Sequence, residues 1–288
     1  MEAVDLLMVG HFAKDKLIVD GVSEDARGGG VYYGSIASRR LGCRVAVATR
    51  LRAEDFPLLD EMKAEGVQVF ATPAGETSGI ANYYQSSDME RRTCVPLGFA
   101  GAFQVEDIPI LPARVIVIAS IIAGEVELPL LQELARRAPV ALDAQGFVRM
   151  REGDQLNSRP WKEMDKGLAA TTYLKVDQAE AEILTGRTEP REAVRVLAGY
   201  GPQEILLTQT SGVTVYAGGR FHHAAFTPRS LAGRTGRGDT CFSTYLSMRL
   251  AYPPEVACAA AGWVTSRKQE KPGPWQGNLE EVRQHLGL

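Results

Sequence analysis

The sequence has no hydrophobic run long enough to cross a membrane. Among its 288 residues the longest apolar run is 115–123 (VIVIASIIA), about half of the ~18 residues that indicate a membrane span. The first residues, MEAVDLLMVG, carry acids where a signal peptide carries basic residues. These absences predict a cytoplasmic protein without a membrane partner.

Cysteine is scarce, and neither sign of charge is in large excess. The four cysteines stand far apart, with no CxxC pair and no histidine at zinc-site spacing: Cys43, Cys94, Cys241 and Cys258. We expect free thiols, which a reducing compartment maintains. The 32 Lys and Arg residues against 35 Asp and Glu residues give a net charge of −3. This balance argues against a nucleic-acid partner and is compatible with a local basic site.

Two common phosphate-binding motifs are also missing. No GxxxxGK(S/T) occurs, which excludes a standard P-loop. No GxGxxG follows the first apolar run, because Tyr33 stands where the third glycine would follow Gly28 and Gly30. A dinucleotide-dependent oxidoreductase is therefore disfavoured, and the lack of any fixed-period repeat disfavours a solenoid.

What is present is an alternation of short apolar runs with stretches of helical periodicity. The predicted strands are Val4–Val9, Arg44–Ala48, Val67–Phe70, Val115–Ala119, Val140–Leu142, Thr172–Val176 and Glu204–Thr208. The predicted helices are Val31–Leu41, Glu54–Glu65, Val126–Arg137, Gln178–Leu184 and Arg191–Ala198, with further helical stretches after residue 239. This order is typical of βαβ units around a mostly parallel sheet, in one large domain or two.

Two stretches interrupt the alternation. Residues 15–22 predict a hairpin around Asp20 and Gly21, and residues 78–95 predict two strands joined by a polar turn. We interpret them as a small antiparallel sheet that covers the main sheet as a lid. An alternative use for the lid residues Ile80, Tyr83 and Tyr84, which we expect to be exposed, is a homodimer surface.

The stretch 231–250 (LAGRTGRGDTCFSTYLSMRL) carries the clearest chemical signal. Its glycines precede a predicted helix that begins at Asp239, and unpaired amides at a helix N-terminus bind anions. An aspartate beside a phosphate is suited to take a proton from the attacking group. The alternative is that Asp239 is only a helix N-cap after a plain turn.

GRTGRGDTC at 233–241 resembles the DTxGAGDxF signature of the ribokinase-like (PfkB) sugar kinases. Four further segments resemble that family in matching order over essentially the whole chain: RGGGVYYGSIASRRLG at 27–42, VALDAQGFVR at 140–149, LKVDQAEAEILTG at 174–186 and LLTQTSGVTVY at 206–216. The resemblance implies a three-layer α/β/α sandwich with a mostly parallel central sheet. It also implies one domain over 1–288, with a small antiparallel β lid made of inserted segments about 12–24 and 76–100.

The resemblance further implies transfer of a phosphoryl group from ATP, with Mg²⁺, to a hydroxyl of a sugar or polyol. Asp239 matches the general base, and the amides of Gly236, Arg237, Gly238 and Asp239 match the anion hole. Glu180, with Asp177 at the position of the motif's Asn, matches residues that place Mg²⁺ through water. In the family's nucleotide-proximal strand and turn, the residues that correspond here are Thr208, Thr210 and Gly212.

For the acceptor, Gly28 and Gly29 match the family's sugar-contacting glycine pair. Tyr33 replaces the family's sugar-binding Asn, a departure from the ribose and fructose kinases. GH at 10–11, GGGVYY at 28–33 and LDAQGFVR at 142–149 resemble the myo-inositol kinase branch more closely. We therefore expect a cyclic polyol at Tyr33, held by some of the residues Asp15, Gln145 and Arg149. The alternative for these last three is a solvated loop residue.

Two other functions are compatible with these motifs. One is a catalytically silent nucleotide or polyol sensor on the same fold, which the charged Arg237 in the anion-hole loop favours. The retained Asp239 and Glu180 favour an enzyme. The other is a kinase for a ribose-, fructose- or nucleoside-type acceptor.

Overall fold

A nine-stranded sheet runs through the centre of the protein. The computed structural model describes residues 2–85 and 88–288 and, within them, all side chains except those of 88–92. From edge to edge the strands are β15 (Arg220–Ala225), β14 (Gly212–Ala217), β13 (Glu204–Gln209), β12 (Tyr173–Asp177), β9 (Val140–Asp143), β8 (Ala113–Ile118), β1 (Val4–Val9), β4 (Val45–Leu51) and β5 (Gln68–Pro73). Every pair from β13 to β5 is parallel, and β14 and β15 extend the sheet in antiparallel pairing. The predicted mostly parallel sheet is confirmed.

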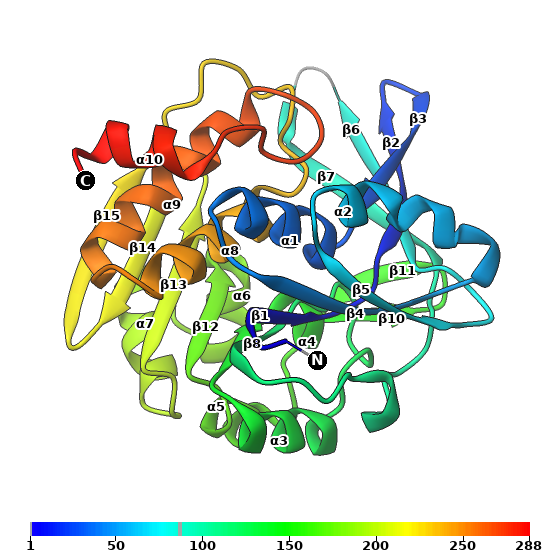
Figure 1. Ribbon diagram of the computed structural model, residues 1–288, viewed down its shortest axis with the longest axis horizontal. Coiled ribbons are helices and arrows are strands. Elements are labelled where there is room, and N and C mark those ends of the chain that lie inside the picture. The colour runs from blue at the N-terminus through cyan, green and yellow to red at the C-terminus, as the bar shows by residue number, and fades with distance from the viewer. Residues whose placement is uncertain (1, 86–87) are drawn as a thin grey trace.

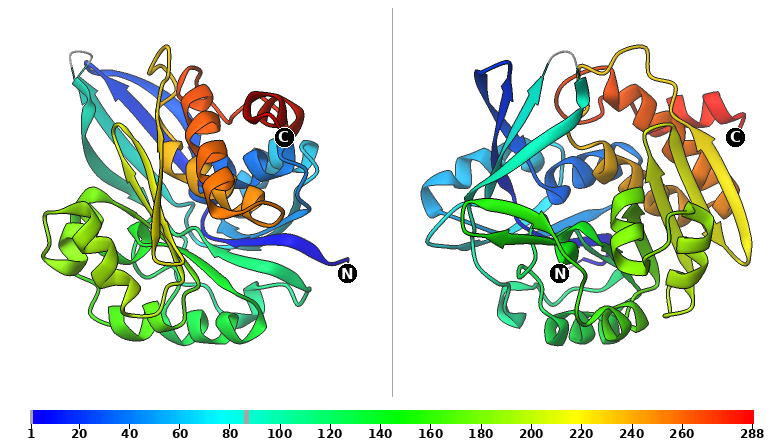
Figure 2. Two further views of the ribbon diagram at one scale, coloured as in Figure 1. Left: turned by 90° about the vertical axis from the view of Figure 1, so that its left-hand side faces the viewer. Right: turned by 180° about the vertical axis from the view of Figure 1, so that it is seen from behind.

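Helices cover both faces of this sheet, as Figures 1 and 2 show. The core on one face includes residues of α1 (Gly30–Arg40), α8 (Arg237–Arg249), α9 (Pro254–Gln269) and α10 (Leu279–Leu286). The core on the other face includes residues of α3 (Leu128–Arg137), α5 (Met164–Ala169), α6 (Gln178–Thr185) and α7 (Pro190–Ala198). The central strands lie between two apolar layers, which explains why their sequences are continuous apolar runs rather than alternating ones.

Two local features differ from the sequence-based expectation. The predicted helix Glu54–Glu65 is a 3₁₀ helix, η1 (Ala53–Leu59), followed by the short α2 (Asp60–Ala64), because Pro57 inside the segment has no N–H to donate. A hairpin of β10 (Arg149–Glu152) and β11 (Gln155–Ser158) follows the short α4 (Gln145–Val148). These four-residue polar strands carry little apolar periodicity, so the sequence did not indicate them.

The lid is a four-stranded sheet in the order β3-β2-β6-β7, and it stands apart from the central sheet (Figures 1 and 2). Its strands are β2 (Ala13–Val19), β3 (Val22–Gly28), β6 (Gly79–Gln85) and β7 (Asp88–Gly98). Both hairpins are antiparallel as predicted. The hairpins join through β2 and β6, which pair in parallel because the chain crosses the core between them. Residues 86 and 87 of the predicted lid segment 76–100 lie outside the described residues.

The faces of β6 correct one expectation about the lid. Ile80 and Tyr84 are each only 5% exposed, whereas Tyr83 is 46% exposed. Successive side chains of a strand point to opposite faces, so Tyr83 lies on the outer face while Ile80 and Tyr84 face inward. Of the three residues predicted as an exposed apolar surface, only Tyr83 is exposed.

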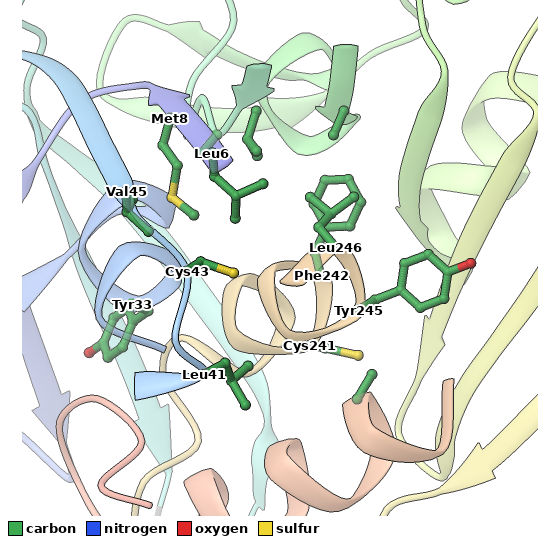
Figure 3. Packing of buried hydrophobic residues seen from close by; sticks show 14 of the residues in the cluster. Leu6, Met8, Tyr33, Leu41, Cys43, Val45, Cys241, Phe242, Tyr245 and Leu246 are labelled. Carbon is green, nitrogen blue, oxygen red and sulfur yellow. The ribbon is translucent and has the colours of Figure 1, made fainter. Parts of the chain in front are cut away.

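Helix α8 is buried throughout its middle part, from Thr240 to Met248. Cys241, Phe242, Tyr245 and Leu246 are all at most 2% exposed. In Figure 3, Phe242 and Leu246 lie toward Leu6 of β1, whereas Tyr245 points away from it, and the Tyr245 hydroxyl donates to Glu204 of β13. Burial of each large apolar side chain stabilises the fold by about 1.5–3 kcal/mol, so α8 is held firmly against the sheet.

Helices α1 and α8 approach each other closely at a glycine. A Cβ atom built on Gly34 of α1 would lie only 2.3 Å from Ser243 Oγ of α8. A glycine inside a helix lowers helix stability by about 1 kcal/mol relative to alanine. Gly34 therefore serves interhelical packing, and it sets how near α8 lies to α1.

We expect Gly34→Leu to lower the free energy of unfolding by roughly 1–3 kcal/mol, because the new side chain must push α8 away from α1. Urea denaturation measures this change. Gly75→Ala is the control, because Gly75 is exposed and a Cβ there meets no atom within 4 Å. Equal unfolding free energies for the two variants would contradict the packing role.

Candidate active site

A cavity of about 270 Å³ lies between the lid and the carboxyl ends of the central strands. The lid contributes Asp15 of β2 together with Ile80, Asn82 and Tyr84 of β6. The sheet edge contributes Asp177 at the end of β12 and Thr208 near the end of β13. The carboxyl edge of a parallel sheet is the usual ligand site of α/β folds, so this cavity is the candidate active site.

The N-terminus of α8 forms one wall of the cavity. Gly236, Arg237, Gly238 and Asp239 all line it, as the sequence predicted for an anion hole and its base. Gly236 is the N-cap residue with φ 82°, a left-handed conformation that glycine adopts without strain. The Arg237 N–H already donates to the Arg234 carbonyl at 3.1 Å. Of the amides that the sequence predicted for an anion hole, that of Arg237 therefore already has a backbone partner.

Gly236 also has no room for a side chain. A Cβ there would lie 2.3 Å from the ring of Tyr33, which is 4% exposed and lines the cavity. The Tyr33 hydroxyl donates to the Arg27 carbonyl at 3.1 Å. Tyr33 thus supports the anion-hole loop from the side of α1.

Asp239 lies beside the start of α1. A Cβ on Gly30 would lie 3.1 Å from Asp239 Oδ1 and 2.9 Å from the Ala119 side chain. The carboxylate therefore sits near the N-termini of two helices, α1 and α8, where the helix dipole favours negative charge. Asp239 thus lies in the cavity wall, in the first turn of α8.

Asp15 and the glycine pair lie together at the lid side. A Cβ on Gly28 would lie 2.0 Å from Asp15 Oδ2, and one on Gly29, whose φ is 91°, would lie 2.4 Å from the His11 carbonyl oxygen. The Asp15 side chain is 7% exposed, and its Oδ1 accepts from the Ile80 amide at 2.8 Å. Asp15 and Gly29 line the cavity, and Gly28 makes room for the carboxylate.

Gln145 and Arg149 also line the cavity, and they contact each other. Arg149 donates to Gln145 Oε1 at 2.9 Å and to the Ile121 carbonyl at 3.4 Å. The four-residue turn of α4 puts these two side chains on the same face. The geometry brings together all the polar side chains that the sequence assigned to the acceptor.

Lys175 is a cavity residue that the sequence reasoning missed. Its Nζ lies 2.9 Å from Asp143 Oδ1 and 3.7 Å from Glu180 Oε2, and it is 3.5 Å from a Cβ built on Gly238. Burial alone would lower the pKa of Lys175, but the carboxylates of Asp143, Glu180 and Asp177 raise the pKa above its ordinary value. A positive charge therefore lies beside Gly238, in the predicted anion hole.

Asp177 and Glu180 form a capping box at the start of α6. The Glu180 amide donates to Asp177 Oδ1 at 2.8 Å, and the Asp177 amide donates to Glu180 Oε2 at 2.7 Å. Burial raises the pKa of the Glu180 carboxyl group, and the Lys175 ammonium opposes that rise. Asp177 lines the cavity, whereas Glu180 lies behind it against Lys175.

The predicted nucleotide residues are only partly brought together. Thr208 is 5% exposed and lines the cavity. Thr210 lies in the turn after β13, and Gly212 begins β14 with its Cα facing the Ala224 carbonyl. Neither residue lines the cavity.

Arg234 and Asn82 are further cavity residues that the sequence did not indicate as site residues. Arg234 lies within the glycine-rich stretch 231–250, so a positive charge beside a predicted anion site could have indicated it. Asn82 gave none, because only the pairing of β6 with β2 turns it toward the cavity.

A buried polar cluster anchors the base of the lid. His11 and Glu125 are both 0% exposed. Ser78 Oγ lies 2.7 Å from His11 Nδ1, and the Glu125 carboxylate accepts from the amides of His11, Ile121 and Ile122 at 2.7–3.0 Å. Burial lowers the pKa of His11, while Glu125 opposes that shift. This cluster fixes the loop that carries Ile121 into the cavity.

Within the described parts of the chain, no group of three or more His, Cys, Asp or Glu side chains could hold a metal ion. Magnesium in phosphoryl transfer keeps several waters and needs only one or two carboxylates besides the substrate phosphates. Asp177, with Glu180 behind it, fits that limited requirement. In the same described residues, no helix has both the length and the apolar character that crossing a membrane needs.

A model of the pfkB family of carbohydrate kinases matches residues 34–276. This chain belongs to the pfkB carbohydrate kinase family. The match spans β4 to α9 and so contains the sheet edge, the anion-hole loop and Asp239.

Three known proteins show how far the similarity extends. A solved pyrophosphate-dependent kinase in the ribokinase family, complexed with a pyrophosphate analog and myo-inositol, is 35% identical, with a TM-score of 0.90 over 97% of this chain and 99% of that one. The cytidine kinase of Thermococcus kodakarensis is 26% identical over 94% of this chain and 98% of its own length. The ribokinase of Arabidopsis thaliana, complexed with ribose and ATP, is 18% identical, with a TM-score of 0.79 over 99% of each chain, and shows the fold alone.

The predicted family and fold are therefore confirmed: the pfkB kinase has a ribokinase-like α/β fold. It is a phosphotransferase that acts on a hydroxyl group, a kinase of a sugar or polyol. This family membership favours the kinase over the silent sensor.

We expect Lys175→Met to lower the free energy of unfolding of the pfkB kinase by about 3–5 kcal/mol, because it leaves buried carboxylates without their cation. Urea denaturation at neutral pH measures the loss. Lys166→Met is the matched control, since Lys166 is an exposed lysine on α5 and its change should stay within about 0.5 kcal/mol. Similar values for both variants would show that Lys175 does not neutralise the cluster.

Proposed function

We propose that this kinase phosphorylates a hydroxyl group of a cyclic polyol, myo-inositol being the favoured acceptor, with Asp239 as the general base. The observation that carries the proposal is that one cavity holds two kinds of lining group. Asp15, Asn82, Gln145 and Arg149 supply hydrogen-bonding groups, and Lys175, Arg234 and Arg237 with the α8 N-terminus supply positive charge. The similar structure that holds myo-inositol supports this acceptor.

The hydrogen-bonding groups suit a ring that carries many hydroxyl groups. A carboxylate accepts from two neighbouring hydroxyls, an amide both donates and accepts, and a guanidinium donates. Asp15 supplies the carboxylate from β2, and the contacting pair Gln145 and Arg149 supplies the amide and the guanidinium. Tyr33 supplies an apolar ring face in the same cavity.

In the proposed reaction the Asp239 carboxylate takes the proton of the acceptor hydroxyl as its oxygen attacks the terminal phosphorus of the donor. The new O–P bond forms as the bond to the leaving phosphate breaks. Amides of the α8 first turn, with Lys175 and Arg237, stabilise the negative charge of the transferred group. The lid covers the acceptor and so excludes water, the competing acceptor.

We infer that pyrophosphate is the preferred donor, with ATP, which the sequence predicted, as the alternative. Besides Arg149, three cationic side chains line the cavity: Lys175, Arg234 and Arg237. The cavity does not reach Thr210 or Gly212, where the sequence had placed the nucleotide, and the similar kinase binds a pyrophosphate analog. Thr208 in the cavity wall is the observation that favours ATP.

Mg²⁺ remains part of this proposal. Asp177, assisted by Glu180, would hold the ion through water beside the donor phosphates. When bound, the ion would neutralise phosphate charge.

The free state of the four cysteines supports a reducing compartment such as the cytoplasm. A homodimer through the outer lid face, where Tyr83 lies, likewise stays a prediction.

Asp239→Asn should lower kcat by about 10²–10⁴-fold and leave donor binding nearly unchanged, because the amide cannot accept the proton. Product formation gives kcat, and calorimetry with pyrophosphate and with ATP gives binding. Glu192→Gln is the control, since Glu192 is also an acid in the first turn of a helix, α7, and lies outside the cavity. Near-normal turnover in Asp239→Asn would refute the general-base assignment.

A substrate panel tests acceptor and donor together. Each of myo-inositol, ribose, fructose and cytidine is paired with pyrophosphate and with ATP, and the phosphorylated product is quantified. We expect the highest kcat/KM for myo-inositol with pyrophosphate. A higher value for cytidine would favour the nucleoside-type alternative, and turnover with ATP alone would overturn the donor assignment. No product from any pair would favour the silent sensor.

A further inference from the structure

Lys268 is fully buried behind the anion-hole loop. It lies in the last turn of α9, is 2% exposed, and its Nζ donates to the Gly233 carbonyl. The same Nζ lies 4.9 Å from the centre of the Tyr33 ring. Lysine is almost never fully buried unless its charge is compensated. Here a carbonyl oxygen, an aromatic face and the negative end of the α9 dipole provide that compensation.

The loop before α8 is pressed against the end of α9 at Gly233. The Gly233 amide donates to the Gln269 carbonyl at 2.8 Å, and a Cβ on Gly233 would lie 1.7 Å from the Lys271 carbonyl oxygen. Backbone meets backbone there, so no side chain separates the loop from α9. The Lys268 ammonium links the two segments from the inside.

Tyr33 connects this contact to the catalytic turn. Its ring lies against Gly236, the N-cap of α8, and it also faces the Lys268 ammonium. One cation therefore contacts both supports of the loop, the Gly233 carbonyl and the Tyr33 ring. Gly233 stands six residues before Asp239 in the chain. The Tyr33 ring lies against Gly236, at the N-terminus of the helix that carries Asp239.

The ammonium is charged at neutral pH. Burial lowers the pKa of Lys268 to about 8, and the Asp239 carboxylate opposes this decrease. The titratable groups that face it are Tyr33 of α1 and Asp239 of α8. Across an adjoining cavity of about 320 Å³, Glu24, Asp25 and Arg27 of β3 lie opposite. That cavity gives small ions a route to the Lys268 position.

We propose that Lys268 is a positioning residue for phosphoryl transfer. Its ammonium acts as a tethered monovalent cation that fixes the Gly233 carbonyl and the Tyr33 ring, and through them the α8 first turn and Asp239. The catalytic part of this inference rests on the proposed function, whereas its structural part does not. A 1 Å displacement of a reacting group can lower the rate about 10²-fold, which sets the expected effect.

The test compares Lys268→Ala, which removes the charge and opens a space, with Lys268→Met, which removes the charge and fills the space. We expect kcat to fall about 10²-fold in both variants at pH 7. Methylammonium chloride should restore at least about a tenth of the lost kcat in Lys268→Ala and none of it in Lys268→Met. Tetramethylammonium chloride at equal ionic strength should restore neither. Lys166→Ala, a change at an exposed lysine on α5, should keep full activity.

Hydrogen exchange provides a readout that does not require the substrate. The amides of residues 233–238 should exchange faster in both variants, and methylammonium should slow them again only in Lys268→Ala. Unchanged exchange in Lys268→Met, which keeps the packing, would overturn the proposal. Faster exchange in Lys268→Ala that methylammonium does not slow would also overturn it, because the charge would then be irrelevant. A wild-type enzyme inactive on every acceptor would contradict the proposed function and leave the exchange result to decide on Lys268.

Discussion

The close approach of α1 and α8 is the constraint on which the active site depends. Three glycines make it possible: Gly34 against Ser243, Gly236 against the Tyr33 ring, and Gly30 beside Asp239 and Ala119. A methyl group at any of the three would meet a neighbour at 3.1 Å or less. Because these contacts leave no room between the two helices, the first turn of α8 is held at the carboxyl edge of the sheet with its amides facing the cavity.

Buried charge is the second organising element. Lys175 lies beside Gly238 and Lys268 contacts Gly233 of the anion-hole loop, and each lysine is at most 4% exposed. Lys175 is balanced by the carboxylates around it, so its charge persists in the protein interior. Lys268 relies on a carbonyl and an aromatic ring. The loop therefore receives positive potential from two buried ammonium groups besides the helix dipole.

Much of the fold followed from local patterns. The apolar runs that became β1, β8, β9 and β13 are buried on both faces, and that is why they stand out in the sequence. The 3₁₀ helix around Pro57 and the polar β10–β11 hairpin were harder to predict, because such short elements leave no long periodic signal in the sequence. The inward direction of Ile80 and Tyr84 depended on strand pairing within the lid, which no local pattern records.

The sequence by itself determined the kinase family, the parallel sheet and the loop that carries Asp239, because glycine spacing and apolar periodicity are local properties. It also indicated Asp15, Gln145 and Arg149, which the fold gathers in one cavity. Only the tertiary structure decided that Asn82 and Lys175 enter this cavity and that Lys268 lies behind its loop. The role of a charged or polar side chain follows from what surrounds it, and those surroundings come from segments far apart in the chain.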